Sequence, residues 1–478
     1  MSLTVVLGFV AAFLTATVSG YWFAASYRPR RDRRRQRRLS EQRERERLER
    51  QRIRDAESDP TPVQSITDRP YRPPDVPVGL PYLYLTELRI SDLRCFGEER
   101  LALRYPGERD EPDLNLPNVN LLLGDNGTGK STVLRAAAMV ALGPVLGSSG
   151  FVPYRLVREN RPSSLVEGRL VFGGLHGPER LACDVRVRRR RDLEVVEADT
   201  TGPYWDDLFD EASPAFFIAG YGVTRRTSDD SRADPSHERG RRRRRFQRVS
   251  SLFDESVTLV PFGSWLPTVG AARQREVTEV LHRLLPEGVR FAEQFEGEDA
   301  VFLRRDLPVP FRALSDGFRS YLGWLGDLLF HLCAVAPDHV PLGSMGGIVL
   351  VDEIDLLLHP SWQRVVVPAV AAMFPNVQFV LTTHSPIVTG TLEARNIVVA
   401  RDDPEAGVSR LREVEAEVHG LNAEQVLLSS YFGLDTTRAP GVAADLAELA
   451  RLAVDGDEDA RRRYLAALVD DAFGGRRG

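Results

Sequence analysis

The hydrophobic and polar positions of this 478-residue chain divide it into segments of different character. Residues 2–27 contain no charged side chain, whereas residues 28–58 are rich in arginine and glutamate. Six prolines follow within a short stretch, and prolines at this density stiffen a chain. Apolar runs long enough to build a core return only after residue 80. We therefore predict five segments: an apolar helix over 3–27, a charged helix over 28–58, a Pro-rich linker over 59–80, a folded body over 81–412 and a helical tail over 413–478.

The N-terminal apolar segment is long enough to cross a membrane. A helix over residues 3–27 would be about 37 Å long, against a hydrocarbon core of about 30 Å. Tyr21, Trp22 and Tyr27 lie toward its end, where interfacial aromatic residues are common. Arginines follow this segment and none precedes it, whereas a signal peptide would carry its positive charge first. We predict a single-pass anchor in the cell membrane with the bulk of the chain in the cytoplasm; a signal peptide and a buried core helix are the alternatives.

The positive charge of the chain is concentrated near its N-terminus. Residues 1–60 hold 14 arginines against 8 acidic residues, while the remainder holds 49 basic and 60 acidic residues. The basic segment is therefore a local feature, and the body is not basic overall. We interpret residues 28–58 as a stop-transfer signal and spacer; the alternatives are a coiled-coil contact and a sensor of anionic lipid. The three cysteines are scattered and form neither a metal-binding pattern nor a disulfide framework.

Inside the body, the periodicity of the apolar positions predicts strands that alternate with helices. Strands are expected at 82–90, 99–103, 119–123, 165–172, 181–187, 193–196, 216–218, 346–351 and 377–381. Helices are expected at 131–142, 271–285 and 315–335, with two more within 440–473. This order predicts an α/β fold with a lid or insertion at about 165–300. A polar stretch at 225–248 contains the run Arg241–Arg245, which we interpret as a solvated loop or as a contact to phosphate or nucleic acid.

Lys130 is the only lysine of the chain, and it stands in a glycine-rich turn between a predicted strand and a predicted helix. The order G-x-x-x-x-G-K-[ST] at this place is that of a P-loop, whose backbone N–H groups surround a β-phosphate. A slim cation on a flexible stem suits such a loop better than the wide fork of arginine. The alternative is a chance glycine-rich turn. We predict that nine residues bind ATP or another nucleoside triphosphate with Mg²⁺: Gly124, Asp125, Asn126, Gly127, Thr128, Gly129, Lys130, Ser131 and Thr132.

Two consecutive acidic residues, Asp352 and Glu353, follow a strongly apolar run in a Walker B pattern. Apolar residues followed by Asp-Glu are a weak signal alone, but they are a strong one in a chain that also has a P-loop. We predict that Asp352 and Ser131 are the protein ligands of Mg²⁺. Glu353 is then placed to orient the attacking water.

Two further positions complete the candidate site. His384 follows the strand predicted at 377–381 and is placed to reach a γ-phosphate, although a lone histidine is more often structural. Ser315 and Gly317 stand in Leu-Ser-Asp-Gly at the start of a predicted helix, where a hydroxyl and free N–H groups face an anion. The alternative for Ser315 is an ordinary N-cap.

Together, these motifs resemble those of an ABC-type ATPase head. More narrowly, the chain is similar to the compact SMC-like, RecF-like and OLD-like AAA family ATPases over about residues 82–430. Three sequences carry the resemblance: Leu-Ser-Asp-Gly at 314–317, the segment from Asp-Glu-Ile-Asp to Leu-His-Pro at 352–360, and Thr-Thr-His-Ser-Pro at 382–386. The chain departs from the family in three respects, the first being that an N-terminal membrane anchor is not typical of RecF-like proteins. Leu356-Leu357-Leu358 stands where the family often has a histidine, and Arg155 to Arg161 occupies the region where a Q-loop glutamine is expected.

The resemblance implies a fold, a reaction and a class of partner. The fold would be a P-loop NTPase head with a mixed sheet flanked by helices, and Lys130, Glu353 and His384 would be its catalytic residues. Two heads would form a head-to-tail homodimer, in which Ser315 and Gly317 of one subunit close over the ATP held by the other. Defence- and repair-associated members suggest a switch that works with DNA or with a nuclease-type effector. The alternatives are an energy-supplying module of a membrane transport complex and a non-enzymatic membrane scaffold.

Overall fold

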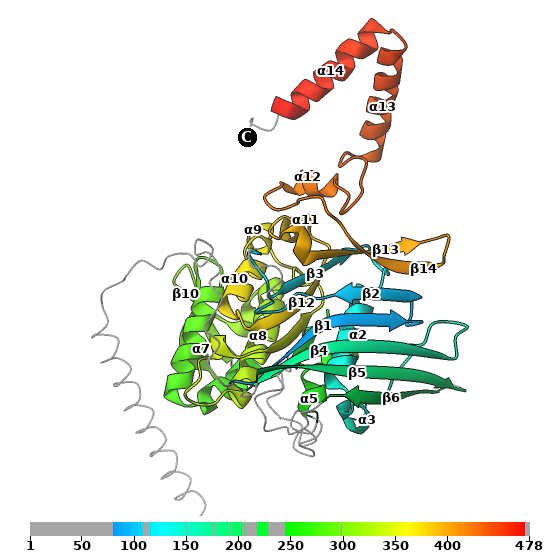
Figure 1. The fold of residues 1–478 in the computed structure, drawn as a ribbon. Helices are drawn as coiled ribbons and strands as arrows, with labels where there is room; N and C mark the ends of the chain where they lie inside the picture. Colours follow the sequence, from blue (N-terminus) through cyan, green and yellow to red (C-terminus); the bar gives the residue numbers. More distant parts are fainter. Residues whose placement is uncertain are drawn as a thin grey trace, which may run out of the picture. The chain divides into compact units, whose positions relative to one another are not determined.

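The structure, a computed structural model, describes residues 80–108, 114–149, 151–174, 177–191, 193–202, 205, 218–227, 244–297 and 299–473 (Figure 1). These residues belong to the compact unit formed by residues 66–478. The predicted anchor, the charged helix, nearly all of the Pro-rich linker and residues 241–243 of the arginine run lie outside the described residues. Among the helices that are described, none has both the length and the apolarity that a membrane span requires.

A six-stranded mixed sheet carries the motifs of the candidate site. Its strand order is β14-β13-β3-β12-β11-β7, in which all strands run parallel except β14. The strands are β3 (Val119–Gly124), β7 (Ile218–Tyr221), β11 (Gly347–Val351), β12 (Val377–Thr383), β13 (Ile397–Asp403) and β14 (Val408–Glu413). The central strands β3, β11 and β12 are buried nearly throughout and mainly apolar, because both faces of this sheet are covered.

The first face of the mixed sheet packs on helix α2 (Lys130–Leu142), which in turn packs on an antiparallel sheet. The antiparallel sheet has the order β2-β1-β4-β5-β6. Its strands are β1 (Tyr82–Ser91), β2 (Glu98–Ala102), β4 (Ser163–Gly174), β5 (Gly177–Arg190) and β6 (Leu193–Thr201). Helix α2 is buried along nearly its whole length, and its alanines let it fit between the two sheets.

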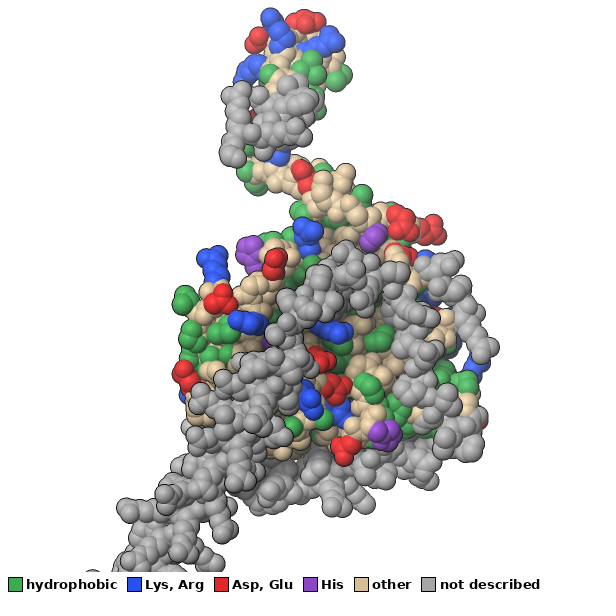
Figure 2. Space-filling view, turned by 90° about the vertical axis from the view of Figure 1, so that its left-hand side faces the viewer, with side chains coloured by type: hydrophobic (Ala, Val, Ile, Leu, Met, Phe, Trp, Pro, Cys, Tyr) green, Lys and Arg blue, Asp and Glu red, His purple; other side chains and the backbone are tan. Residues whose placement is uncertain are grey.

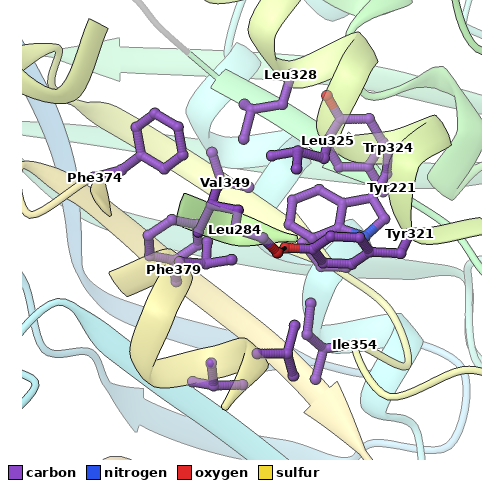
Figure 3. Packing of buried hydrophobic residues seen from close by; sticks show 14 of the residues in the cluster. Tyr221, Leu284, Tyr321, Trp324, Leu325, Leu328, Val349, Ile354, Phe374 and Phe379 are labelled. Carbon is purple, nitrogen blue, oxygen red and sulfur yellow. Dashed lines mark hydrogen bonds between the residues drawn. The ribbon is translucent and has the colours of Figure 1, made fainter. Parts of the chain in front are cut away.

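The second face of the mixed sheet packs on helices α7 (Ala271–Leu284), α8 (Asp316–Val335) and α10 (Val366–Met373). Figure 3 shows Trp324, Leu325 and Leu328 of α8 packed near Val349 of β11. In the same core the Tyr321 hydroxyl donates a hydrogen bond to the Leu284 carbonyl, at 3.1 Å, which ties α8 to α7. Successive residues of β11 point to opposite faces of the sheet: Val349 and Val351 belong to this core, and Ile348 and Leu350 belong to the core around α2.

Further elements surround this framework. A three-stranded antiparallel sheet consists of β8 (Val289–Glu296), β9 (Asp299–Arg304) and β10 (Leu307–Pro310). The short helices are α3 (Val145–Ser149), α5 (Arg244–Gln247), α6 (Phe262–Trp265), α9 (Pro360–Gln363), α11 (Pro386–Thr389) and α12 (Ala423–Leu427). The predicted pair near the C-terminus is α13 (Pro440–Val454) and α14 (Glu458–Phe473), which contact each other. On the face shown in Figure 2, basic and acidic side chains of the described residues are interspersed.

The predicted strands and helices agree well with these elements, and two sets of strands were not predicted. Strands β8 and β9 and the pair β13–β14 carry charged residues that interrupt their apolar pattern, and β10 is a four-residue strand with two prolines. The region grouped as an insertion, at about 165–300, is distributed over all three sheets. Strands β4 to β6 extend the antiparallel sheet, β7 is an edge of the mixed sheet, and β8 and β9 belong to the third sheet.

Candidate nucleotide-binding site

The order of the strands brings the predicted motifs to one edge of the mixed sheet. Strand β12 lies between β3, which leads into the P-loop, and β11, which leads into Asp352 and Glu353. In the parallel register, Leu123 is opposite Thr383, and Val351 is opposite Leu381. The loops that follow the three strands therefore leave the sheet side by side. Ligands of open α/β sheets bind at such carboxyl ends.

Glycines shape the loop after β3. Gly127 and Gly129 have φ values of 87° and 95°, in the left-handed region that side chains disfavour. A Cβ atom at Gly129 would also lie within 3 Å of the Cys95 sulfur and of the Phe96 ring, so the loop closes tightly against the β1–β2 connection. The Thr128 hydroxyl donates to the Asp125 carbonyl at 2.8 Å and holds the turn. Helix α2 begins directly afterwards, so its first N–H groups are available to an anion.

The Lys130 side chain folds back over this loop. Its Nζ donates hydrogen bonds to the Gly124 and Asp125 carbonyls, each at 2.9 Å. Burial lowers the pKa of Lys130, while the nearby carboxylates, Asp352 and Glu353 foremost, act in the opposite direction. The ammonium group is therefore largely removed from water, and a phosphate group at the loop would offer it stronger acceptors than the two carbonyls.

Neighbouring loop residues differ in exposure. Ser131 is half-buried in the first turn of α2, and Thr132 beside it is buried. Asp125 and Asn126 at the tip of the loop are exposed. The structure thus places all nine predicted loop residues in one strand–loop–helix unit, with Ser131 in the first helical turn.

A threonine from β12 holds the two Walker B acids. The Thr382 hydroxyl donates to Oδ1 of the buried Asp352 at 2.6 Å, and it accepts a hydrogen bond from the Glu353 N–H at 2.7 Å. Glu353 has φ 49°, an uncommon backbone conformation for a residue with a side chain. The sequence alone predicts no role for Thr382, although it stands in the Thr-Thr-His-Ser-Pro sequence. Its function is to fix the acids of one strand from the neighbouring strand.

His384 lies directly beyond β12 and is half-buried. Burial lowers its pKa below the ordinary value, the charge of Lys130 lowers it further, and Glu353 and two aspartates oppose the shift. Its neighbours on both sides are anchored: the Thr383 hydroxyl donates to Asp355, and the Ser385 hydroxyl donates to Gln363 Oε1 at 2.8 Å. The imidazole is therefore held in the same electrostatic environment as Lys130 and the Walker B acids.

Ser315 and Gly317 begin helix α8. Ser315 is exposed and occupies the N-cap position, but its side chain makes no capping hydrogen bond. The N-cap alternative for its hydroxyl is therefore not realised in this structure. Gly317 is buried, and a Cβ atom there would lie less than 3 Å from the Leu357 carbonyl oxygen. The loop after the Walker B acids thus packs directly on the start of α8.

Two arginines near this site were not predicted. Arg225 follows β7, is buried, and donates to the main-chain carbonyls of Asp352 and Glu353, the latter at 2.8 Å. Arg94 lies in the β1–β2 connection beside the P-loop, and its buried Nε has no hydrogen-bond partner. Arg225 is the first residue of the polar stretch at 225–248, and the polar composition of that stretch gave no sign that this arginine is buried. Its position just after an apolar strand was the one available signal.

The donor set fits ATP and Mg²⁺. The P-loop supplies N–H groups and an ammonium, and Asp352 and Ser131 supply oxygen ligands, which Mg²⁺ prefers. Mg²⁺ commonly takes only one or two protein ligands and completes its shell with phosphate and water. Within the described ranges, no three His, Cys, Asp or Glu residues converge to form a metal site of their own.

The fold and these motifs define a P-loop ATPase of the ABC/SMC-like class. Residues 119–389, more than half of the chain, match the family described as "AAA domain, putative AbiEii toxin, Type IV TA system". The chain belongs to this family.

Two bacterial proteins are similar to parts of this chain. The "Retron Ec83 probable ATPase" of Escherichia coli is 33% identical over 130 residues, which cover 27% of this chain and 24% of that protein. The "Septu protein PtuA" of Bacillus mycoides (strain KBAB4) is 24% identical over 323 residues, covering 66% of this chain and 41% of that protein. The chain thus spans less than half the length of either relative. An SMC head solved with the C-winged helix domain of ScpA is 16% identical, with a TM-score of 0.42, over 69% of this chain and 97% of that one.

Proposed function

We propose that this protein binds and hydrolyses ATP and acts as a switch in a defence system. The observation that carries the proposal is the meeting of Lys130, Asp352, Glu353 and His384 at the carboxyl ends of three adjacent strands. Lys130 shares an electrostatic environment with the two acids and the imidazole, which is the arrangement that phosphoryl transfer to water requires.

Each residue has a role that follows from its position. The loop N–H groups and Lys130 bind the β- and γ-phosphates, and Asp352 and Ser131 hold Mg²⁺, which supplies charge neutralisation when bound. Glu353 orients the water that attacks the γ-phosphate. Because burial lowers the pKa of His384, the imidazole is neutral at neutral pH. It can then donate one N–H to a γ-phosphate oxygen without adding positive charge.

We further propose that two copies hold ATP between them in a head-to-tail arrangement. The exposed Ser315 hydroxyl, which is not used as a cap, supports this arrangement because it is free to contact a ligand outside its own chain. The buried Gly317 beside it keeps the helix start against the Leu357 carbonyl. The symmetry of such a pair gives two equivalent sites.

The defence role and the partner rest on similarity and on charge. The retron and Septu names of the relatives support an ATPase that works with an effector protein in a defence system. The motif resemblance adds DNA or a nuclease-type effector as the proposed partner. The apolar residues 3–27 and the arginines after them support attachment to the cytoplasmic face of the cell membrane. The switch would then report to its effector at that membrane.

ATP turnover and assembly by a Glu353→Gln variant test the proposal. Wild-type protein in detergent should hydrolyse ATP, and Glu353→Gln should lose about a hundredfold in rate while it still binds ATP. Because ATP is then retained, size-exclusion chromatography should show the variant as a dimer with ATP and as a monomer without it. A wild-type protein without ATPase activity would overturn the enzymatic proposal. A Glu353→Gln variant that stays monomeric with bound ATP would overturn the shared site.

A further inference from the structure

Arg225 is a buried cation whose hydrogen bonds go to the backbone of the Walker B acids. It stands four residues beyond β7, the strand that pairs with β11. Its Nη2 donates to the carbonyls of both Asp352 and Glu353, and its Nε donates to the Gly222 carbonyl at 3.1 Å. A guanidinium fork can reach consecutive carbonyls while it remains tied to its own loop, which a lysine ammonium cannot do in the same geometry.

The surrounding hydrogen bonds tie the same two residues on their other sides. The Asp352 N–H donates to the Tyr221 carbonyl at 2.8 Å, and the Glu353 N–H donates to the Thr382 hydroxyl at 2.7 Å. The N–H and C=O groups of both acids are therefore occupied by neighbouring strands and by Arg225. This fixation is needed because Glu353 adopts φ 49°, a conformation that persists only where surrounding contacts enforce it.

The charge of Arg225 is retained despite its burial. Burial lowers its pKa to about 10, with Asp352, Glu353 and Asp355 opposing the shift. The side chain is therefore a cation at neutral pH, and it lies among the carboxylates that also surround Lys130. Burial of a cation costs free energy of desolvation, and the hydrogen bonds of Arg225 go to main-chain carbonyls and not to a carboxylate. A functional role would explain why a cation is kept at this position.

We infer that Arg225 is a positioning residue for ATP hydrolysis, which holds the Asp352–Glu353 turn so that the Glu353 carboxylate points to the nucleotide. This inference rests on the proposed function, because it assigns a task within the same reaction. This task requires no contact between Arg225 and the nucleotide or the attacking water. Its loss should therefore reduce the rate of the chemical step much more than the affinity for ATP.

The test compares Arg225→Met and Arg225→Lys with wild type and with a matched control, Arg273→Met. Arg273 on α7 also donates to two main-chain carbonyls, those of Val340 and Pro337, at 3.0 and 2.9 Å, but it does not contact the Walker B turn. The full chain is used, with kcat from steady-state turnover and Kd for ATP from calorimetry. Arg225→Met should lose about tenfold or more in kcat, with Kd changed by less than about threefold. Arg225→Lys should recover part of the rate, and Arg273→Met should keep kcat.

The double variant Arg225→Met/Glu353→Gln separates positioning from a general loss of structure. If Arg225 acts through Glu353, the double variant should hydrolyse ATP no more slowly than Glu353→Gln alone, since residues that act as a unit are not additive. A double variant whose loss in kcat equals the product of the two single-variant losses would overturn the inference. An unchanged kcat in Arg225→Met would overturn it as well. Should Arg225→Met fail to fold, the decision rests on Arg225→Lys: reduced kcat with retained Kd supports positioning, and wild-type kcat contradicts it. An inactive wild type would instead refute the proposed function itself.

Discussion

At the scale of single residues, Lys130 shows why one lysine stands in a chain whose other basic residues are all arginines. Its Nζ fits between the Gly124 and Asp125 carbonyls, inside a loop that closes against Cys95 and Phe96. A guanidinium is wider and planar, and its charge is spread over three nitrogens. The space that the loop leaves therefore selects a point charge on a flexible stem.

This geometry predicts that Lys130→Arg, like Lys130→Ala, weakens ATP binding by about tenfold or more, the loss expected for a charge-assisted contact. The reason is steric for arginine and electrostatic for alanine. Calorimetric titration with ATP measures the effect, and Arg273→Lys, an exchange of the same two side chains on α7, is the control. Wild-type affinity in Lys130→Arg would show that the loop accepts either cation.

At the scale of elements, the start of helix α8 and the loop after β11 form one joint. Gly317 leaves no room for a side chain, because the Leu357 carbonyl lies where a Cβ atom would be. Leu357 itself has φ 59° and an exposed side chain, and the Phe318 ring packs against Trp362 at 5.1 Å between centroids. The start of α8, which is proposed to contact the ATP of the other subunit, is thus in direct contact with the loop that follows the Walker B acids of its own subunit.

A single methyl group at this joint should have a measurable cost. Gly317→Ala is expected to lower the free energy of unfolding by about 1–3 kcal/mol, the range for inserting atoms into a packed site. Gly323→Ala on the same helix is the control, because its added Cβ would meet its nearest heavy atom at 3.6 Å and alanine favours a helix. Urea unfolding of both variants gives the comparison. Equal stability of the two would show that the loop at Leu357 yields freely.

At the scale of the whole molecule, the described residues form two cores on opposite faces of the mixed sheet. Every motif of the candidate site lies at or after Gly124, whereas the apolar segment ends by Tyr27 and the prolines follow. The parts of the chain that could bind ATP and those that could bind a membrane are therefore separate in sequence. The membrane attachment itself remains a prediction.

Removal of residues 1–58 tests this separation. The truncated protein should bind and hydrolyse ATP at the wild-type rate, because the residues of the site and both cores remain. In cells it should leave the membrane fraction, since the apolar helix and the basic segment are removed together. Fractionation of tagged full-length and truncated chains is the measurement. A truncated chain that still sediments with membranes would show that the body binds the bilayer or an integral partner.

Much of the fold could be predicted because local sequence carries its signal. The strands that lead into the P-loop and into Asp352 are continuous apolar runs, and such runs occur where both faces of a strand are buried. Helix α2, which is buried, and the pair α13–α14, in which α13 has no buried residue, were both predicted from their periodicity. Strands β8, β9, β13 and β14 were missed because charged residues interrupt their pattern, and β10 was missed because it is short and contains two prolines. Among the strands, continuous apolar runs were therefore the easiest to identify.

The sequence by itself determined the chemistry of this protein, since the order and spacing of the P-loop, the Walker B acids and the Thr-Thr-His sequence specify a phosphate site wherever they meet. Only the tertiary structure decided how they meet. Strand β12 is inserted between β3 and β11, which brings Thr382 to Asp352 across 30 residues and Arg225 to the same turn across 127. The physical reason is that periodicity records whether a residue is buried, whereas the partner of a buried hydrogen-bonding group depends on the order in which strands pack.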